Sequence, residues 1–358
     1  MIKEIALLYH LNLNHYSLSS SMKKAYLQEG IGILANSIKV PCNLSLSGQD
    51  LETIYYESPK VFDSLMKNDN IKFHFSSFSH FLPSYFPEDI DNQLKMGLNV
   101  FKKLIPPEKF LGIGLFAEYD FPTHKDKVKI VNKYFTSILI NSSLVDHRGM
   151  KNCPGIYTYK INKKKEITLI CVHKNTEYRN TYHMYLREFA SPVQVIHSIK
   201  IDAYLNNIYA FHIDFEAPII NIVTKLNKTK TIKFPPRYDL FQILQNKFLH
   251  SDLNFVFLNN SSCSDLKNIP EISSFGELAL GVERNNDYFQ LIEMLNANRK
   301  EIIKRNKKEY LEAINSDNFV QHQKSIVLEG CYKGNLGKIY IRKNGRQEKI
   351  NHLLKINR

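Results

Sequence analysis

Two acidic side chains that could act as a pair stand at the ends of apolar segments. Glu118 follows the apolar run Phe110–Ala117. Asp214 lies near the end of a second run, two residues after His212 and two before Glu216. Side chains of a strand alternate between its faces, so these last three residues are expected to point the same way. Ionisable groups on an apolar strand are costly to bury unless they are paired or used.

The chemistry that fits two carboxylates from different strands is glycoside hydrolysis. One carboxylate attacks the anomeric carbon or stabilises its charge, and the other protonates the leaving oxygen. A single acid at a strand end has a simpler interpretation, because acidic residues commonly cap helices or form loop salt bridges. The interpretation of Glu118 and Asp214 as a catalytic pair therefore requires that several strand ends meet at one place in the fold.

Short apolar strands alternate with amphipathic helices along the chain, which is typical of βα units around a parallel sheet. Strands are expected at Ile5–His10, Val40–Leu46, Ile71–Ser77, Phe110–Ala117, Ser137–Ile140, Ile208–Phe215 and Asn254–Leu258. Helices are expected near 21–37, from about 50 to 67, from Pro87 onwards, over Tyr238–Phe248 and over Asp287–Ala313. Two further strands, Tyr157–Tyr159 and Ile167–Val172, flank a polar turn like a hairpin.

These elements predict an α/β fold organised as one β/α barrel. We expect the catalytic barrel to occupy residues 1–322, with an insertion around 150–205, and a small β-rich extension to occupy 323–358. A barrel of this length forms a single domain. Functional side chains of such barrels project from the carboxyl ends of the strands and from the loops that follow.

Other polar side chains stand at the expected strand ends. They are His10 and Asn12 after the first strand, His80 after the third, and Tyr119 beside Glu118. Either histidine could also be an ordinary core histidine with its hydrogen bonds satisfied. If the strand ends form a pocket, both would bind sugar hydroxyls at its floor.

Several of these segments resemble, in order and spacing, the motifs of the family-57 glycoside hydrolases, which act on α-glucans and related α-linked sugars. The resemblance covers residues 5–145 well and 205–300 more loosely. It rests on segments 8–14, 41–48, 71–83, 111–118, 212–216, 274–277 and 283–286. Leu111–Glu118 is similar to the family segment that carries the nucleophile, and His212–Glu216 looks like the segment that carries the acid/base aspartate.

The resemblance implies a distorted, seven-stranded barrel and a retaining mechanism. It assigns Glu118 as the nucleophile and Asp214 as the acid/base. The expected substrate-binding residues are His10, Asn12, His80, His212, Glu216, Tyr119 and Phe275. The expected partner is an oligo- or polysaccharide, with no cofactor. An α-galactosidase of the same family, or a barrel that only binds carbohydrate, remains an alternative.

The chain departs from the family in having no tryptophan. Gly114 and Phe275 stand where sugar-stacking tryptophans are expected. Any aromatic face can stack on a sugar, so the candidates to replace them are Tyr9, Phe78, Phe116, Tyr119 and Phe215.

Composition and charge bear on whether the protein binds nucleic acid, a membrane or a metal ion. The formal net charge of +13 would suit nucleic acid, but the lysines accompany an excess of Ile and Asn, and their clusters lie in solvated turns and helix faces. No apolar run is long enough to span a membrane, and we expect a cytoplasmic protein without membrane or nucleic-acid partners. The five cysteines include no Cys-x-x-Cys pair, and no His-x-x-x-His spacing suggests a metal.

Overall fold

The structure is a computed structural model of the 358-residue chain. It describes residues 3–13, 23–24, 26–122, 124–146, 155–173, 176–186, 188–206, 208–215, 238–258, 267–268, 292–293 and 295–315.

Seven parallel strands form the centre of the described structure. Each pairs with the next, and the last pairs back onto the first, so the sheet closes into a barrel. In barrel order they are β1 (Glu4–His10), β2 (Cys42–Ser45), β3 (Ile71–Ser76), β4 (Phe110–Leu115), β5 (Ser137–Asn141), β7 (Lys165–His173) and β8 (Ala210–Asp214). This confirms the predicted seven-stranded β/α barrel of parallel strands.

Three further strands lie outside the closed barrel. β6 (Ile156–Asn162) pairs antiparallel with β7, which is the hairpin that the sequence predicts. β10 (Lys267–Asn268) adds to β6, and β9 (Asn254–Phe255) adds to β1. The segment around 150–205 therefore contributes the barrel strand β7 as well as material outside the barrel. The expected extension at 323–358 lies outside the described residues.

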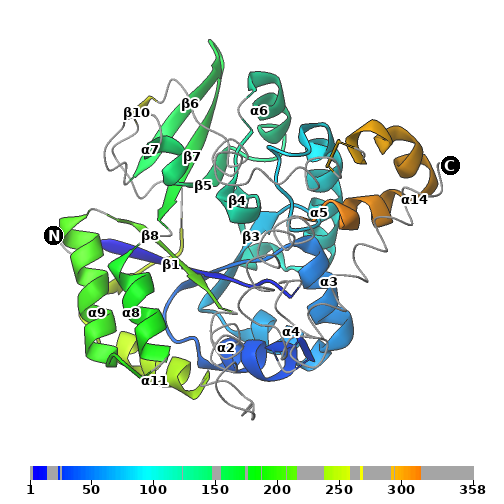
Figure 1. Cartoon of the computed structure of the whole chain (residues 1–358). Helices are drawn as coiled ribbons and strands as arrows, with labels where there is room; N and C mark the ends of the chain where they lie inside the picture. Colours follow the sequence, from blue (N-terminus) through cyan, green and yellow to red (C-terminus); the bar gives the residue numbers. More distant parts are fainter. Residues whose placement is uncertain are drawn as a thin grey trace, which may run out of the picture.

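Helices surround the barrel, as Figure 1 shows. The longer ones are α3 (Gly48–Glu57), α4 (Pro59–Lys67), α5 (Ile90–Leu104), α8 (Glu177–Leu186), α9 (Pro192–Lys200), α11 (Tyr238–Leu249) and α14 (Arg299–Ala313). Shorter ones are η1 (Tyr26–Gly30), α2 (Ile31–Ser37), η2 (Pro87–Asp89), η3 (Pro107–Lys109), η4 (Ala117–Tyr119), α6 (Lys125–Val131), α7 (Ser143–Asp146) and η5 (Ile201–Leu205).

The start of α3 shows how local sequence fixes one of these helices. The Ser47 hydroxyl accepts a hydrogen bond from the Asp50 N–H, and the Asp50 carboxylate accepts one from the Ser47 N–H, which forms a capping box. The single helix expected from 50 to 67 is two helices, α3 and α4, because Pro59 begins the second and cannot donate the hydrogen bond that a continuous helix needs.

Two hydrophobic layers follow from the alternation of side chains along the strands. Leu8 on β1 and Leu115 on β4 belong to one buried cluster although their strands are not neighbours, so they meet across the barrel interior. The alternate side chains, such as Leu7 on β1, belong to a larger cluster shared with the helices. A residue's cluster therefore tells whether it faces the barrel interior or the helices.

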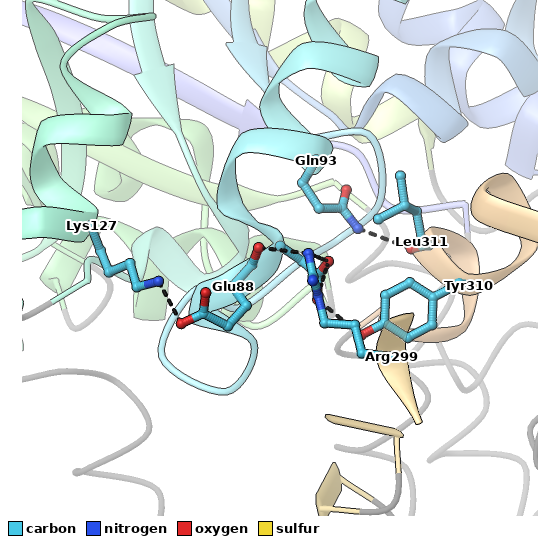
Figure 2. A network of polar contacts seen from close by, with 7 residues as sticks. Glu88, Gln93, Lys127, Arg299, Tyr310 and Leu311 are labelled. Atoms are coloured by element: carbon cyan, nitrogen blue, oxygen red, sulfur yellow. Dashed lines mark hydrogen bonds and ion pairs between the residues drawn. The ribbon is translucent and has the colours of Figure 1, made fainter. Parts of the chain in front are cut away.

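Helix α14 is tied to the amino-terminal end of α5. Arg299 and Tyr310 both bond the buried carboxylate of Asp89, at 2.8 Å and 2.9 Å. Gln93 donates to the Leu311 carbonyl at 3.0 Å (Figure 2). The same Gln93 amide group bonds the Ser79 hydroxyl at 2.9 Å, so α14 also supports the loop after β3. In the described part of the chain, none of the helices is long and apolar enough to cross a membrane.

Candidate active site

The carboxyl ends of the barrel strands lie at one end of the barrel because the strands are parallel. His10 on β1 is level with Ser45 on β2 and with Asp214 on β8. His212 and Asp214 alternate with Phe211 and Ile213, which face the helices, so both acid and imidazole point into the barrel mouth. This confirms that His212 and Asp214 share a face.

Glu118 sits in a turn immediately after β4, and its backbone adopts a rare conformation. Glu118 has φ 55° and ψ 12°, and Tyr119 has φ 56°. Two successive residues other than glycine with positive φ are strained, at a cost of about 1–3 kcal/mol each. The turn is held by its surroundings: the Ala117 N–H donates to the Phe81 carbonyl at 3.2 Å, and the Asp120 carboxylate accepts from the Ser84 N–H at 2.9 Å.

A chain of hydrogen bonds connects Tyr119, the residue after Glu118, to Asp214 through His212. The Tyr119 hydroxyl lies 2.6 Å from Nδ1 of His212, and Nε2 of His212 lies 2.7 Å from Oδ1 of Asp214. The other carboxylate oxygen, Oδ2, accepts a hydrogen bond from Nη2 of Arg179 at 2.5 Å. The Asp214 carboxylate is thus bonded to the imidazole of His212 on one oxygen and to the guanidinium of Arg179 on the other.

The pKa of Tyr119 depends on its burial and on the charges around it. Burial raises the pKa of Tyr119 well above its ordinary value. The charges of Asp214 and Glu118 raise this pKa further, whereas a hydrogen bond from Ser45 and the charge of Arg179 lower it. Asp214 is linked to the Tyr119 hydroxyl through His212, and Glu118 is the residue before Tyr119 in the chain.

Three imidazoles lie beside this group. The ring centre of His10 is 5.0 Å from that of His80 and 5.9 Å from that of His212. Nδ1 of His10 lies 3.1 Å from the Ser45 hydroxyl. All three rings are buried. Histidines of this kind can donate to or accept from sugar hydroxyls, depending on the tautomer.

The structure brings together most of the residues that the sequence singles out. Tyr119, Asp214 and the three histidines converge, Glu118 precedes Tyr119 in the turn after β4, and Asn12 is buried just beyond the end of β1. Glu216, Phe275 and the segments 274–277 and 283–286 lie outside the described residues. The roles of these residues in substrate binding and catalysis stay predictions.

The aromatic candidates separate into two groups. Tyr119 belongs to the cluster inside the barrel. Tyr9, Phe78, Phe116 and Phe215 belong to the outer cluster, where they pack against helices, so the expectation that they stack on a sugar is wrong. Their strand positions decide this: Tyr9, for example, alternates with the inward residues Leu8 and His10.

Gly114 also faces away from the barrel interior. A Cβ atom at this position would lie 2.5 Å from ring atoms of Phe135, which belongs to the outer cluster. A larger side chain at 114 would therefore enter the layer under the helices rather than a sugar site. The absence of tryptophan at this position removes nothing from the barrel mouth.

Two residues of the site, Arg179 and Ser45, are not predicted from the sequence. Arg179 lies on α8, within the segment expected to be an insertion, and no motif marks it. Ser45 ends β2 and contacts His10 and Tyr119, whereas the hydroxyl of Ser47, two residues later, caps α3. The alternation along β2 could have identified Ser45 as the inward residue. Among the described residues no group of three or more His, Cys, Asp or Glu side chains is arranged to hold a metal ion.

The chain was compared with protein families, with curated protein sequences and with solved structures. No protein-family model matches the chain, and no curated protein sequence does. Several solved structures are similar in fold, among them a glucanotransferase and two amylases. The 4-α-glucanotransferase of Thermococcus litoralis gives a TM-score of 0.62 at 15% identity, covering 89% of this chain and 56% of that one.

The α-amylase of Thermotoga maritima gives a TM-score of 0.60 at 10% identity, covering 99% of this chain and 93% of that one. The exo-type maltose-forming amylase of Pyrococcus sp. ST04 gives 0.54 at 10% identity, covering 98% and 72%. The chain thus spans little more than half of the glucanotransferase but nearly all of the first amylase. It shares the barrel fold of a glucanotransferase and two amylases.

Proposed function

We propose that the chain is a retaining α-glycosidase or transglycosidase related to the family-57 glycoside hydrolases, acting on α-linked glucans. The observation that carries the proposal is that Tyr119, the residue after Glu118 in the turn that follows β4, is hydrogen-bonded to His212, which is in turn bonded to Asp214 at the barrel mouth. A carboxylate pair at the carboxyl end of such a barrel supports two-step displacement at an anomeric carbon. The shared fold with a glucanotransferase and two amylases supports the α-glucan substrate class.

In the first step, the Glu118 carboxylate forms an ester bond with the anomeric carbon. The bond from that carbon to the glycosidic oxygen breaks, and Asp214 gives its proton to the departing oxygen. In the second step, Asp214 takes a proton from water or from an acceptor sugar, whose oxygen attacks the same carbon and releases Glu118. Retention by this route requires the two carboxyl groups to be about 5–5.5 Å apart.

The strained turn at Glu118 fits the role of nucleophile. Strain of this kind persists where the surroundings over-determine it, and it is concentrated at functional sites. The bond from the Ala117 N–H to the Phe81 carbonyl and the bond from the Ser84 N–H to the Asp120 carboxylate hold the turn in place. A fixed carboxylate needs no reorganisation when the sugar arrives.

The first experiment measures turnover of a panel of aryl α-glucosides, α-galactosides and maltooligosaccharides. Glu118→Gln and Asp214→Asn are each expected to lose at least about 1,000-fold in kcat while unfolding at temperatures close to wild type. Full activity of either variant on every substrate that the wild type cleaves contradicts the assignment. Preference for the aryl α-galactoside would select the α-galactosidase alternative.

The second experiment separates the two carboxylates. A small external nucleophile such as azide should rescue Glu118→Gly by attacking the activated aryl glycoside directly, giving a glycosyl azide of inverted configuration. In Asp214→Gly, azide should instead attack the Glu118 ester and give the retained product. Binding of maltooligosaccharides without any turnover, in wild type and variants alike, would favour a barrel that only binds carbohydrate, which the lack of tryptophan makes a real alternative.

A further inference from the structure

Asp214 has a donor on each of its carboxylate oxygens. Oδ1 lies 2.7 Å from Nε2 of His212, and Oδ2 lies 2.5 Å from Nη2 of Arg179. The side chains of Asp214 and Arg179 are 22% and 25% exposed, so their ion pair is partly shielded from water. A shielded pair interacts more strongly than one at the open surface.

The proton on His212 can be assigned from its neighbours. Tyr119 is buried and its pKa is raised, so the phenol keeps its proton and donates it to Nδ1 of His212. Nδ1 therefore accepts, and the ring proton sits on Nε2, which donates to Asp214. Ser45 donates to the Tyr119 oxygen and so completes a chain of donors that all point toward the carboxylate.

Every donor in this arrangement favours the ionised form of Asp214. A guanidinium has no acceptor and does not lose its proton, so its bond to Oδ2 stabilises the carboxylate relative to the protonated acid. The ionised form suits the second catalytic step, in which Asp214 takes a proton. The first step needs the opposite state. By favouring the ionised form of Asp214, Arg179 thus helps the second step and opposes the protonated form that the first step needs.

We propose that Arg179 is a positioning residue that sets the protonation of Asp214, and thereby the alkaline limit of activity. The inference rests on the proposed function, because it assumes that Asp214 is the general acid. The titratable and charged groups around Asp214 come from several elements: His10 on β1, Glu118 and Tyr119 on η4, Arg179 on α8 and His212 on β8. Among these groups, Arg179 donates a hydrogen bond to Oδ2 of the carboxylate and carries a permanent positive charge.

The direction of the effect follows from the charge. kcat/KM of a glycosidase falls on the alkaline side when its general acid loses the proton. Removing the arginine charge lets Asp214 hold its proton to higher pH. Arg179→Gln should therefore move the alkaline limb of the kcat/KM profile upward by about one pH unit. Arg179→Lys keeps the charge and should leave the limb close to its wild-type position.

Lys200→Gln is the matched control. It removes one positive charge from the neighbouring helix α9, where Lys200 pairs with the exposed Asp252 at 2.7 Å. Its profile should superimpose on that of the wild type. A purely structural role of Arg179 would lower kcat/KM at all pH values without moving the limb. An active Arg179→Gln enzyme whose limb has not moved overturns the proposal.

A titration without turnover separates this proposal from the proposed function. The carboxyl carbons of aspartate are labelled with ¹³C, and the Asp214 signal is assigned by its loss in Asp214→Asn. Its midpoint should rise in Arg179→Gln, even if the protein cleaves no α-glycoside, in which case the proposed function fails and the Arg179 effect stands. An unchanged midpoint overturns the Arg179 effect. If Arg179→Gln does not fold, a wild-type midpoint at or above the range of exposed aspartates overturns it equally.

Discussion

Single residues in this molecule differ sharply in what their charges contribute, and Figure 2 shows two neighbouring examples. The Asp89 carboxylate is fully buried and is bonded by Arg299 and Tyr310. The next acid back along the chain, Glu88, pairs with Lys127 but is 63% exposed. A buried charge that loses its partner keeps the full cost of desolvation, whereas an exposed pair contributes little.

Replacing Arg299 by Met should therefore lower the free energy of unfolding by about 3–5 kcal/mol, because Asp89 would stay buried without its cation. Lys127→Met should cost less than about 1 kcal/mol, since Glu88 remains in water. Urea unfolding followed by circular dichroism gives both values. Equal losses in the two variants would show that burial of Asp89 does not make the difference.

At the scale of elements, the site depends on how closely α5 approaches the end of β3. Gly97 lies where a Cβ atom would be 2.5 Å from the Ser76 carbonyl oxygen and 2.9 Å from the Phe78 nitrogen. These are backbone atoms, which cannot move aside as a flexible side chain would. The loop that begins there carries His80 into the site, so a glycine on a helix outside the barrel fixes the position of a site histidine.

Gly97→Ala should destabilise the protein by about 1–3 kcal/mol, because the added methyl group forces α5 and β3 apart. Gly32→Ala is the matched control in helix α2, where the nearest atom to the new methyl is a side-chain carbon of Val61 at 3.6 Å. This second change should stabilise by about 0.5–1 kcal/mol, because alanine has the higher helix propensity. Thermal unfolding of both variants measures the two effects, and a stabilised Gly97→Ala would contradict the close approach.

The molecule as a whole encloses a titratable group in its barrel. His74 lies on β3 with no exposed surface, on the opposite face from Phe73 and Phe75, which pack under the helices. Burial lowers the pKa of His74 to about 4, although the backbone of Ile113 offsets part of the effect. In the unfolded chain the same imidazole titrates near 6.5. The unfolded state therefore binds a proton in a pH range where the folded state does not.

The contribution of His74 to stability should be complete above pH 6.5 and should be lost as the pH falls toward 4. The shift from 6.5 to about 4 corresponds to about 3 kcal/mol. His74→Leu should remove this part of the pH dependence of the free energy of unfolding, whereas His197→Leu, at an exposed position, should keep it. A wild-type free energy that stays constant between pH 6.5 and 4 would contradict the assignment.

Local periodicity in the sequence determined the strands, most of the helices and the inward direction of His212 and Asp214. These features depend on residues two to four positions apart, so short segments contain the information. The order of the strands and their common carboxyl end follow from parallel pairing. A parallel β/α barrel with polar strand ends could thus be predicted from the residues, whereas the number of seven strands followed from the resemblance to the family-57 glycoside hydrolases.

The tertiary structure alone decided which of these side chains meet. β7 belongs both to a hairpin and to the closed barrel, and only its pairing with β5 and β8 reveals the second role. Tyr119 and His212 are 93 residues apart, and their bond depends on the strained turn after β4. Arg179 reaches Asp214 from a helix with no recognisable motif. Such contacts join distant parts of the chain, and their free energy exists only when the barrel closes.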